Sequence, residues 1–393
     1  MDLGWGDALA TGTDKDYWAA QALPSVLKHK LLGQYVPRFG GMTGSRGWQV
    51  VYLDGYAGEG RYASGDSGSA EIAMQVAAHH LEKNGLLWNC FFVEQKPDSV
   101  ARLDQVAAQY RALGVDARVH HADVGGVLGE VLLAAAGLPL FLFLDPCGLG
   151  LPFDRIVQTL NQRRTARVWQ PTEFLMNFSM DAVRRLGGNA RSARGVERSS
   201  ERFDEACGGR WWREYFRPDE PVAADVDEIV AARYAQRLRE QTGMFVQSVP
   251  VARKPGHKAV YHLVFGTRSA HGLWFFGDAV ARARDAWWAG LENKEEQEDP
   301  DALFSAASMV RPDPQEIIDA AVPVMAGNME RILHRGRRPF KLLDHTLEVF
   351  GDYYGQVTER AARNAVKLLH SSGRTASTGV GGKTHELIVE PPR

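Results

Sequence analysis

Asp54-Gly55-Tyr56-Ala57-Gly58-Glu59-Gly60 is the stretch that decides the fold of this 393-residue chain. It overlaps the end of residues 48–54, a β-branched and apolar run that reads as a buried strand. The glycines allow a sharp turn and a close approach of the backbone to a ligand, which a side chain would obstruct. A glycine-rich turn is by itself more often only a turn, so the neighbouring segments decide whether a ligand binds here.

Three further predicted strands lead to an acidic side chain. These acids are Glu94, Asp123 and Asp145, and Pro146 follows the last of them. Ligands of an open α/β sheet bind in the crevice outside the carboxyl ends of its strands, so four such ends in order predict a nucleotide-type cofactor site. Asp123 also precedes a predicted helix, and for this residue capping the helix and binding the ligand stay open as alternatives.

Strand and helix patterns alternate from the first strand to residue 179. Such alternation is typical of a parallel sheet with helices on both faces, which places the chain in the α/β class. A helix is expected over residues 16–35, followed by a glycine-rich turn at Gly40, Gly41, Gly44 and Gly47. The strands are expected at residues 48–54, 89–94, 116–121, 139–145 and 172–179, with two late strands at 244–251 and 261–266.

The pattern predicts four parts in the chain. They are an N-terminal helical segment 1–47, the α/β domain 48–290, an acidic linker 291–313 and a C-terminal helical module 314–393. In the last part, helices are expected over 314–331, 340–350 and 358–370 and a strand over 383–389, an order typical of a small winged-helix module. Residues 331–393 carry 11 Lys and Arg against six acidic residues, which makes a local basic patch.

A helical, basic insertion interrupts the α/β domain at about residues 180–243. Within residues 183–217 it holds nine Arg against five acidic residues, together with Trp211-Trp212 and Tyr215-Phe216. Arginines with aromatic residues between them suit phosphate contact and base stacking. Such aromatics more often cover a sheet as core residues, with the arginines on a solvated face, so both interpretations stay open.

The composition excludes several classes of protein. The 46 Lys and Arg nearly balance the 48 Asp and Glu, so any contact with nucleic acid must come from a local patch. Cys90, Cys147 and Cys207 form no pair at metal or redox spacing, which argues against a disulfide framework and a structural zinc site, and no metal is expected. The start does not read as a secretion signal, and the apolar runs are far shorter than the roughly 20 residues of a membrane span, so a cytoplasmic protein is expected.

The missing motifs narrow the choice of cofactor. A dinucleotide fold has G-x-G-x-x-G leading into a helix and an acid about 20 residues on, whereas Glu94 lies well beyond that distance and no Walker motif is present. The arrangement resembles the Rossmann-type S-adenosylmethionine-dependent methyltransferases. Within these, about residues 28–278 resemble the three-Cys-motif partner family, through Lys28-His29-Lys30 and residues 54–62, 68–70, 92–94, 144–148, 173–177 and 261–272.

The resemblance implies a Rossmann-like methyltransferase sheet, S-adenosylmethionine as the cofactor and a C-terminal winged-helix-like module. It implies that Glu94 binds the ribose, that Asp123 binds the adenine and that Asp145 faces the methyl group. For Lys28, a charge on the helix surface is the alternative. The residues implied to bind the rest of the cofactor are Asp54, Gly55, Tyr56, Ala57, Gly58 and Gly60, and the implied catalytic residues are Asp145, Pro146, Tyr56 and Lys28.

The chain departs from one related pattern. Methyltransferases that act on exocyclic amines carry an Asp-Pro-Pro-Tyr type sequence here, whose acid and backbone carbonyl orient the nitrogen while the aromatic residue stacks on the flipped base. This chain has Cys147 for the second proline and Gly148 for the aromatic residue. Tyr56, Phe153 or Trp169 is a candidate replacement. Cys147 is expected to be a small buried or backbone-positioning residue rather than a nucleophile.

These features predict an S-adenosylmethionine-dependent methyltransferase of a nucleic-acid base or nucleotide-like substrate, with RNA or DNA held by the insertion and the C-terminal module. A biosynthetic small-molecule methyltransferase is the alternative that Gly148 favours. A non-catalytic regulatory partner with a methyltransferase-like fold is a third interpretation, and the resemblance adds a three-Cys-motif protein as an expected partner. The methylated atom, RNA versus DNA, and the oligomeric state stay open.

Overall fold

The computed structural model describes residues 18–19, 21–44, 49–146, 148–164, 170–190, 197–217, 220–298 and 306–392. The chain forms two compact units. The first comprises residues 1–25 and 36–268, and the second comprises residues 26–35 and 269–393. Helix α1 (Leu23–Thr43) therefore contributes residues to both units.

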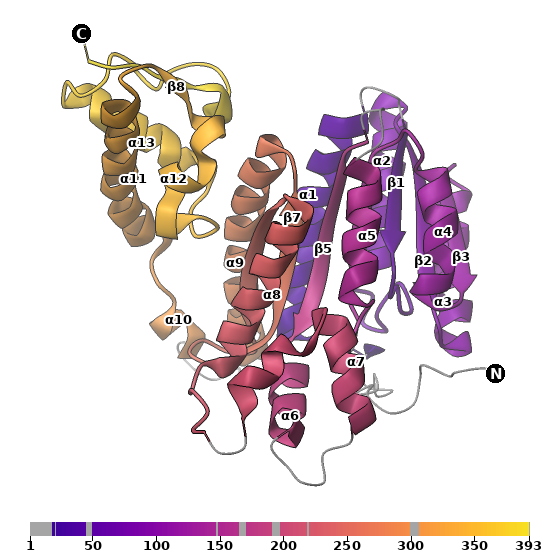
Figure 1. Cartoon of the computed structure of the whole chain (residues 1–393). Helices are drawn as coiled ribbons and strands as arrows, with labels where there is room; N and C mark the ends of the chain where they lie inside the picture. The colour runs from indigo at the N-terminus through magenta and orange to yellow at the C-terminus, as the bar shows by residue number, and fades with distance from the viewer. Residues whose placement is uncertain are drawn as a thin grey trace. The chain divides into compact units, whose positions relative to one another are not determined.

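A seven-stranded sheet with the order β3-β2-β1-β4-β5-β7-β6 lies at the centre of the first unit (Figure 1). The first five strands are parallel, and β7 runs antiparallel to β5 and β6. In this doubly wound order β1 and β4 flank the point where the strand order reverses, which is where ligands bind. The predicted Rossmann-like sheet is confirmed, with strands β1 Gln49–Asp54, β2 Leu87–Glu94, β3 Asp116–His121, β4 Leu140–Leu144, β5 Thr172–Ser179, β6 Phe245–Ala252 and β7 Ala259–Thr267.

Helices cover both faces of this sheet, as predicted. On one face, Leu53 and Leu142 pack in a core shared with α4, α5 and α8. On the other face, the ring of Tyr52 stacks on that of Phe141 at 6.0 Å, and Phe39 of α1 lies 5.3 Å from Phe141. The helices of this unit are α2 Ser69–Asn84, α3 Pro97–Arg111, α4 Val124–Ala134, α5 Phe153–Arg164, α6 Met180–Ala190, α7 Glu197–Cys207, the 3-10 turn η3 Arg210–Phe216 and α8 Val226–Thr242.

The glycine-rich turn predicted after the first helix is wrong at Gly40 and Gly41. Helix α1 begins later than expected, at Leu23, and continues through both glycines to Thr43. A Cβ atom on Gly40 would lie 2.3 Å from Cζ2 of Trp88, so this glycine lets the helix approach the sheet closely. Gly47 lies outside the described residues. A glycine in this sequence therefore marks close helix packing as well as a turn.

The second unit has its own core, in which Met325 and Leu369 are fully buried. This unit contains a helix, a short strand, two helices and a second strand in that order, which agrees with a winged helix. That the unit is a winged-helix module stays a prediction. The helix predicted over residues 340–350 is wrong at its start, because residues 340–341 pair with the last strand instead. The elements are α9 Ala270–Glu298, α10 Ala306–Val310, α11 Pro314–Gly336, β8 Phe340–Lys341, α12 Thr346–Phe350, α13 Glu359–Ser371, the 3-10 turn η6 Thr384–Glu386 and β9 Ile388–Val389.

The expected acidic linker begins inside a helix. Residues 291–298 continue α9, because Leu291 is buried and Lys294 pairs with Glu298 one turn further on. Glu292 also forms an ion pair with Arg311, at 3.0 Å. Residues 299–305 lie outside the described part of the chain. No helix in the described part is both long enough and apolar enough to cross a membrane.

Candidate functional site

Four polar side chains stand at the carboxyl ends of neighbouring strands on one face of the sheet. Asp54 of β1 lies opposite Phe92 and Phe143, and Phe143 lies opposite Leu175. Side chains two residues apart on a strand point to the same face. Glu94, Asp145 and Asn177, each two residues beyond one of these partners, therefore share the face of Asp54. The β1–β4 junction thus collects three carboxylates and one amide.

The loop after β1 is held in a conformation that only glycine suits. Gly55 N–H donates to the carbonyl of Phe143 and Ala57 N–H to that of Val93, both at 2.9 Å. Gly58 has φ +59° and Gly60 has φ +79°, in the left-handed region. A Cβ atom on Gly58 would also lie 2.1 Å from Cζ2 of Trp18. The turn brings its backbone to the sheet edge where the predicted ligand binds.

The Glu94 carboxylate anchors this loop. Its Oε2 accepts from Gly58 N–H at 3.0 Å, and its Oε1 accepts from the N–H groups of Gln95 and Lys96 at 2.9 and 2.8 Å. A carboxylate has about four acceptor positions, so these bonds leave Oε2 with capacity for one more donor. Sequence reasoning gave Glu94 a role toward a ribose only and missed its bond to the loop.

Asp123 caps helix α4. Its Oδ1 accepts from Gly125 N–H at 2.8 Å, and its Oδ2 accepts from the Gln95 side-chain amide at 2.9 Å. The side chain is exposed, so the unused acceptor positions face solvent. Of the two alternatives left by the sequence, the structure contains the cap, and the contact with an adenine stays a prediction.

Asn177 holds the carboxylate of Asp145. Its Nδ2 donates to Asp145 Oδ1 at 2.8 Å. Its Oδ1 is buried and has no hydrogen-bond partner among the residues that the structure describes. A buried acceptor without a donor costs about 1–3 kcal/mol, so this oxygen is available to accept a hydrogen bond from water or from a ligand at the strand end. The sequence had shown Asn177 only within a motif, although its alignment with Asp145 across two strands was the available signal.

Tyr52 places a protonated hydroxyl beneath these carboxylates. The side chain is fully buried, and its hydroxyl finds no hydrogen-bond partner within the described part of the chain. Burial raises the pKa of Tyr52 well above its usual value, and the charges of Asp54, Cys90 and Asp145 raise it further. The group therefore stays an O–H donor throughout the physiological pH range. This residue was missed by sequence reasoning, which treated the strand as core.

Tyr56 and Pro146 lie together beside the same loop. Tyr56 N–H donates to Asp54 Oδ1 at 3.1 Å. A Cβ atom on Gly150 would lie 3.6 Å from the Tyr56 hydroxyl and 2.9 Å from Cγ of Pro146, so both side chains border one backbone segment. Lys28 lies on α1 with a buried side chain, and its catalytic role stays a prediction.

The structure excludes one of the three aromatic replacements proposed for base stacking. Phe153 is fully buried, and its ring packs edge-on against Tyr234 at 5.5 Å, so the prediction that it stacks on a substrate is wrong. The physical reason is that Phe153 begins α5 on the face that packs against the sheet core. Trp169 and Cys147 lie outside the described residues. Tyr56, which is half-buried, remains.

Several arginines of the insertion form ion pairs with acids of the same segment. Arg184 pairs with Asp227 at 2.6 Å, and Arg213 pairs with Asp204 at 2.7 Å. The other arginines of residues 183–217 with described side chains also have partners: Arg185, Arg202, Arg210 and Arg217. Among the aromatic residues, Trp212 and Phe216 are buried, whereas Trp211 is partly and Tyr215 well exposed. The interpretation as core residues therefore holds for Trp212 and Phe216, and base stacking by the exposed aromatic residues stays a prediction.

Comparison with known proteins yields likeness in structure only. No protein-family model matches the chain, and no curated protein matches it. Among solved structures, the chain is similar to the small RNA methyltransferase HEN1, with 8% identity, a TM-score of 0.32 and coverage of 62% of this chain and 26% of that one. It is also similar to a putative rRNA-methylase from Clostridium thermocellum, with 8% identity, a TM-score of 0.29 and coverage of 59% and 94%. A third is the methyltransferase domain of bacterial CtHen1-CN, with 9% identity, a TM-score of 0.28 and coverage of 61% and 99%.

Proposed function

We propose that the chain is an S-adenosylmethionine-dependent methyltransferase that acts on nucleic acid. The observation that carries the proposal is the shared face of Asp54, Glu94 and Asp145 at the strand ends around the glycine loop. This is the position at which a doubly wound sheet binds its ligand. When bound, S-adenosylmethionine supplies a methyl group on a sulfonium, which is an electrophile that needs no metal or redox partner.

The donor and acceptor groups fit such a cofactor. The left-handed backbone of Gly58 and Gly60 turns the loop back at the sheet edge, and we assign the amino-acid end of the cofactor to this loop. Glu94 keeps acceptor capacity on Oε2 for a ribose hydroxyl, and Asp123 has exposed carboxylate oxygens for an adenine amino group. Asp54, Gly55, Tyr56 and Ala57 complete the proposed set.

Asp145 and Asn177 are the proposed acceptor-side residues. The amide of Asn177 fixes the orientation of the Asp145 carboxylate, which orients the attacking group by a hydrogen bond and takes up the proton released after attack. The unpaired Oδ1 of Asn177 accepts a second hydrogen from the same group. Two acceptors side by side suit an NH₂ group, which favours an amino nitrogen as the methylated atom. Pro146 and Tyr56 exclude water on one side.

The C-terminal unit supports nucleic acid as the substrate. Arg360 and Lys367 are exposed on α13 and have no ion-pair partner within the described residues. Arg363 of the same helix donates to the carbonyls of Gly379 and Gly381, which fixes the glycine-rich loop beside this helix. Helix and loop form one basic surface of the kind that contacts phosphates. A winged-helix module that holds the polymer is part of this proposal.

A small-molecule substrate is the second candidate. Gly148 stands where amine methyltransferases of nucleic acid carry a stacking residue, and Arg184 and Arg213 of the insertion are paired with acids. A small substrate needs neither a stacking platform nor phosphate contacts.

The finer likeness to the three-Cys-motif partner family, with a three-Cys-motif protein as the partner, also remains a proposal.

Calorimetric titration of the full chain with S-adenosylmethionine, and separately with S-adenosylhomocysteine, tests the cofactor. We expect micromolar binding of both and a loss of about tenfold or more in Glu94→Ala, because a bond to a charged group contributes about 1.5–3 kcal/mol. Glu82→Ala, an exposed acid on α2, is the matched control and should bind normally. Circular dichroism checks that Glu94→Ala stays folded. Absence of binding to the wild-type chain would refute the proposal.

Salt dependence separates the two substrate candidates. Binding of an RNA or DNA oligonucleotide should weaken by about tenfold or more between 50 and 200 mM salt, whereas a small neutral substrate should hardly respond. The double variant Arg360→Ala/Lys367→Ala should reduce this salt dependence, and Lys254→Ala, an exposed lysine between β6 and β7, should leave it unchanged. Oligonucleotide binding that ignores salt would favour the small-molecule candidate.

A further inference from the structure

Two histidines and a glutamate meet in the second unit. His271 lies at the start of α9, and His385 and Glu386 lie in η6, more than 100 residues later in the sequence. One ligand atom from each residue lies within 4.8 Å of the others. Nε2 of His271 is 3.6 Å from Glu386 Oε1, and Nε2 of His385 is 3.4 Å from the same oxygen. The three side chains converge on one point.

These separations suit a shared ion better than direct hydrogen bonds. An N–H···O bond spans about 2.7–3.2 Å, and both distances are longer. Ligands bound tetrahedrally at about 2.0–2.2 Å from a zinc ion are separated by about 3.4 Å. The distances from Glu386 to the two histidines therefore match the edge of such a tetrahedron, and the third pair lies within 4.8 Å.

Contacts with neighbouring side chains orient two of the three groups. Lys341 forms an ion pair with Oε2 of Glu386, which leaves Oε1 directed at the histidines. His385 is buried against Phe275, with its Nδ1 lacking any partner in the described part of the chain, so Nε2 is its route to a polar group. His271 and Glu386 are 44% and 45% exposed, which gives an ion access from solvent.

We propose that His271, His385 and Glu386 bind a Zn²⁺ ion, with the fourth position open to water. Two imidazoles and one carboxylate are a donor set that suits zinc. The ion would join the start of α9 to the C-terminal segment and so stabilise the second unit. Sequence reasoning considered zinc only through cysteine spacing, which cannot detect ligands so far apart. This proposal does not depend on methyl transfer.

Calorimetric titration of the EDTA-treated, dialysed full chain with ZnCl₂ tests the site. We expect one ion per chain with a Kd of about 1 µM or tighter, and a rise in Tm on adding zinc. His271→Ala, at a partly exposed position, should weaken binding by about tenfold or more. His334→Ala is the matched control, because His334 is an exposed histidine of the same unit that pairs with Glu330.

Co²⁺ in place of zinc gives a second readout. A tetrahedral Co²⁺ site absorbs strongly in the visible range, and we expect this absorption in the wild-type chain and in His334→Ala but not in His271→Ala. Should His385→Ala fail to fold because its ring is buried, Glu386→Gln removes the carboxylate with little change of shape. Absence of stoichiometric zinc binding, or equal binding by the wild type, His271→Ala and Glu386→Gln, would overturn the proposal.

Discussion

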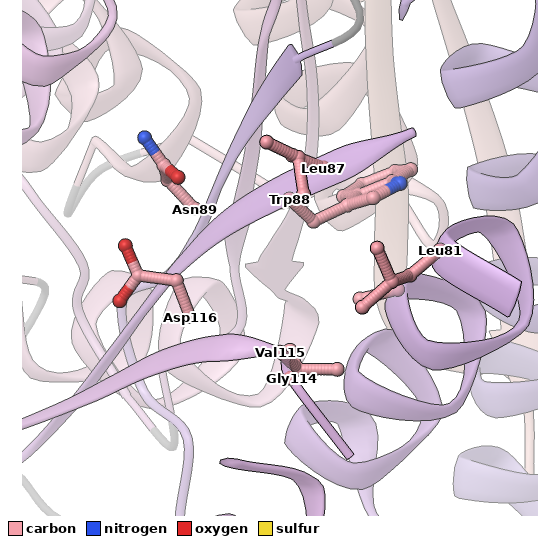
Figure 2. A pocket seen from close by; sticks show the side chains of 8 residues that line it. Leu81, Leu87, Trp88, Asn89, Gly114, Val115 and Asp116 are labelled. Atoms are coloured by element: carbon pink, nitrogen blue, oxygen red, sulfur yellow. The ribbon is translucent and has the colours of Figure 1, made fainter. Parts of the chain in front are cut away.

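The two ends of the seven-stranded sheet differ in what they present. At the amino ends of β2 and β3 lies a hollow of about 210 Å³, with Leu81 and Trp88 on one side and Asn89 and Asp116 on the other (Figure 2). Asp116 is paired with Arg118 at 2.7 Å. At the carboxyl ends, Asp54, Glu94 and Asp145 share one face of the sheet with Asn177, whose Oδ1 lacks a partner in the described structure. The hollow is at one end and the convergent polar groups are at the other.

A hollow in the surface is therefore not sufficient to identify a catalytic or binding site. The carboxyl ends of β2, β3 and β5 lead within a few residues to a helix N-terminus, where unpaired backbone N–H groups attract anions and acidic side chains. Asp123 uses this at the start of α4. The amino ends instead receive helix C-termini, such as that of α2 before Gly85. We therefore expect substitutions at the two ends to affect different properties.

The largest expected effect is on turnover. Asp145→Ala should lower the rate of methyl transfer by about 100-fold or more with cofactor binding retained, because proton acceptance and orientation of the nucleophile are lost. Asn177→Ala should cost about tenfold, because the carboxylate loses its support. Asp116→Ala, at the amino end, should leave the rate unchanged. Single-turnover assays measure all three, and a full rate in Asp145→Ala would remove that residue from the site.

The second effect compares two glycines with similar backbones. Gly58 and Gly85 have φ of +59° and +70°, but a Cβ atom meets Trp18 only at Gly58 and open space at Gly85. Gly85→Ala should therefore lose only about 1–2 kcal/mol of stability, because alanine is strained in the left-handed conformation. Gly58→Ala should lose more stability and also weaken cofactor binding. Urea unfolding and calorimetry check this, and equal losses in both variants would contradict a tight fit at the loop.

The third effect is a pH dependence near the amino end. Nδ1 of His80 accepts from Trp88 Nε1 at 3.2 Å, and burial, with a contribution from His79, lowers the pKa of His80. The unfolded chain then binds protons more readily, so stability is full above about pH 6.5 and falls as the pH drops below it. His80→Gln should lose less Tm between pH 7.5 and 5.5 than the wild type. An equal loss would mean that other histidines cause the dependence.

The smallest effect is expected in the hollow itself. Leu87 lines it and is 48% exposed, so Leu87→Ser should change the free energy of unfolding by about 0.5 kcal/mol or less and leave methyl transfer unchanged. Denaturant unfolding and a rate assay measure both quantities. A marked loss of activity in this variant would mean that the amino end takes part in function, which would break the contrast between the two ends.

The strands could be predicted closely because their runs of apolar and β-branched residues indicate strand unambiguously. Residues 116–121 and 172–179 were expected as strands and form β3 and β5 with the same bounds. The acids at the strand ends were recognised because polar residues that end apolar runs are conspicuous. Gly40 was misjudged because a glycine that admits Trp88 against a helix looks the same, in sequence, as one that makes a turn.

The remaining features depend on contacts between distant segments. The role of Asn177 can be recognised only when β5 lies beside β4, because its amide then reaches Asp145, 32 residues earlier. Phe153 was one of three candidates for base stacking that the sequence could not place, and in the structure it lies in the core at the start of α5. His271 and His385 come together only through the packing of the second unit. Local patterns carry no signal for such pairs.

The shared face of Asp54, Glu94 and Asp145 also limits how the gene for this chain can change in length. A deletion of one codon within β2 would turn Glu94 to the opposite face and present an apolar neighbour in its place. The loop closed by the bridge between Arg61 and Ser67 can lengthen at a small entropic cost. Among descendants of this gene, insertions and deletions should therefore accumulate in such loops, while the codon count of the central strands stays fixed.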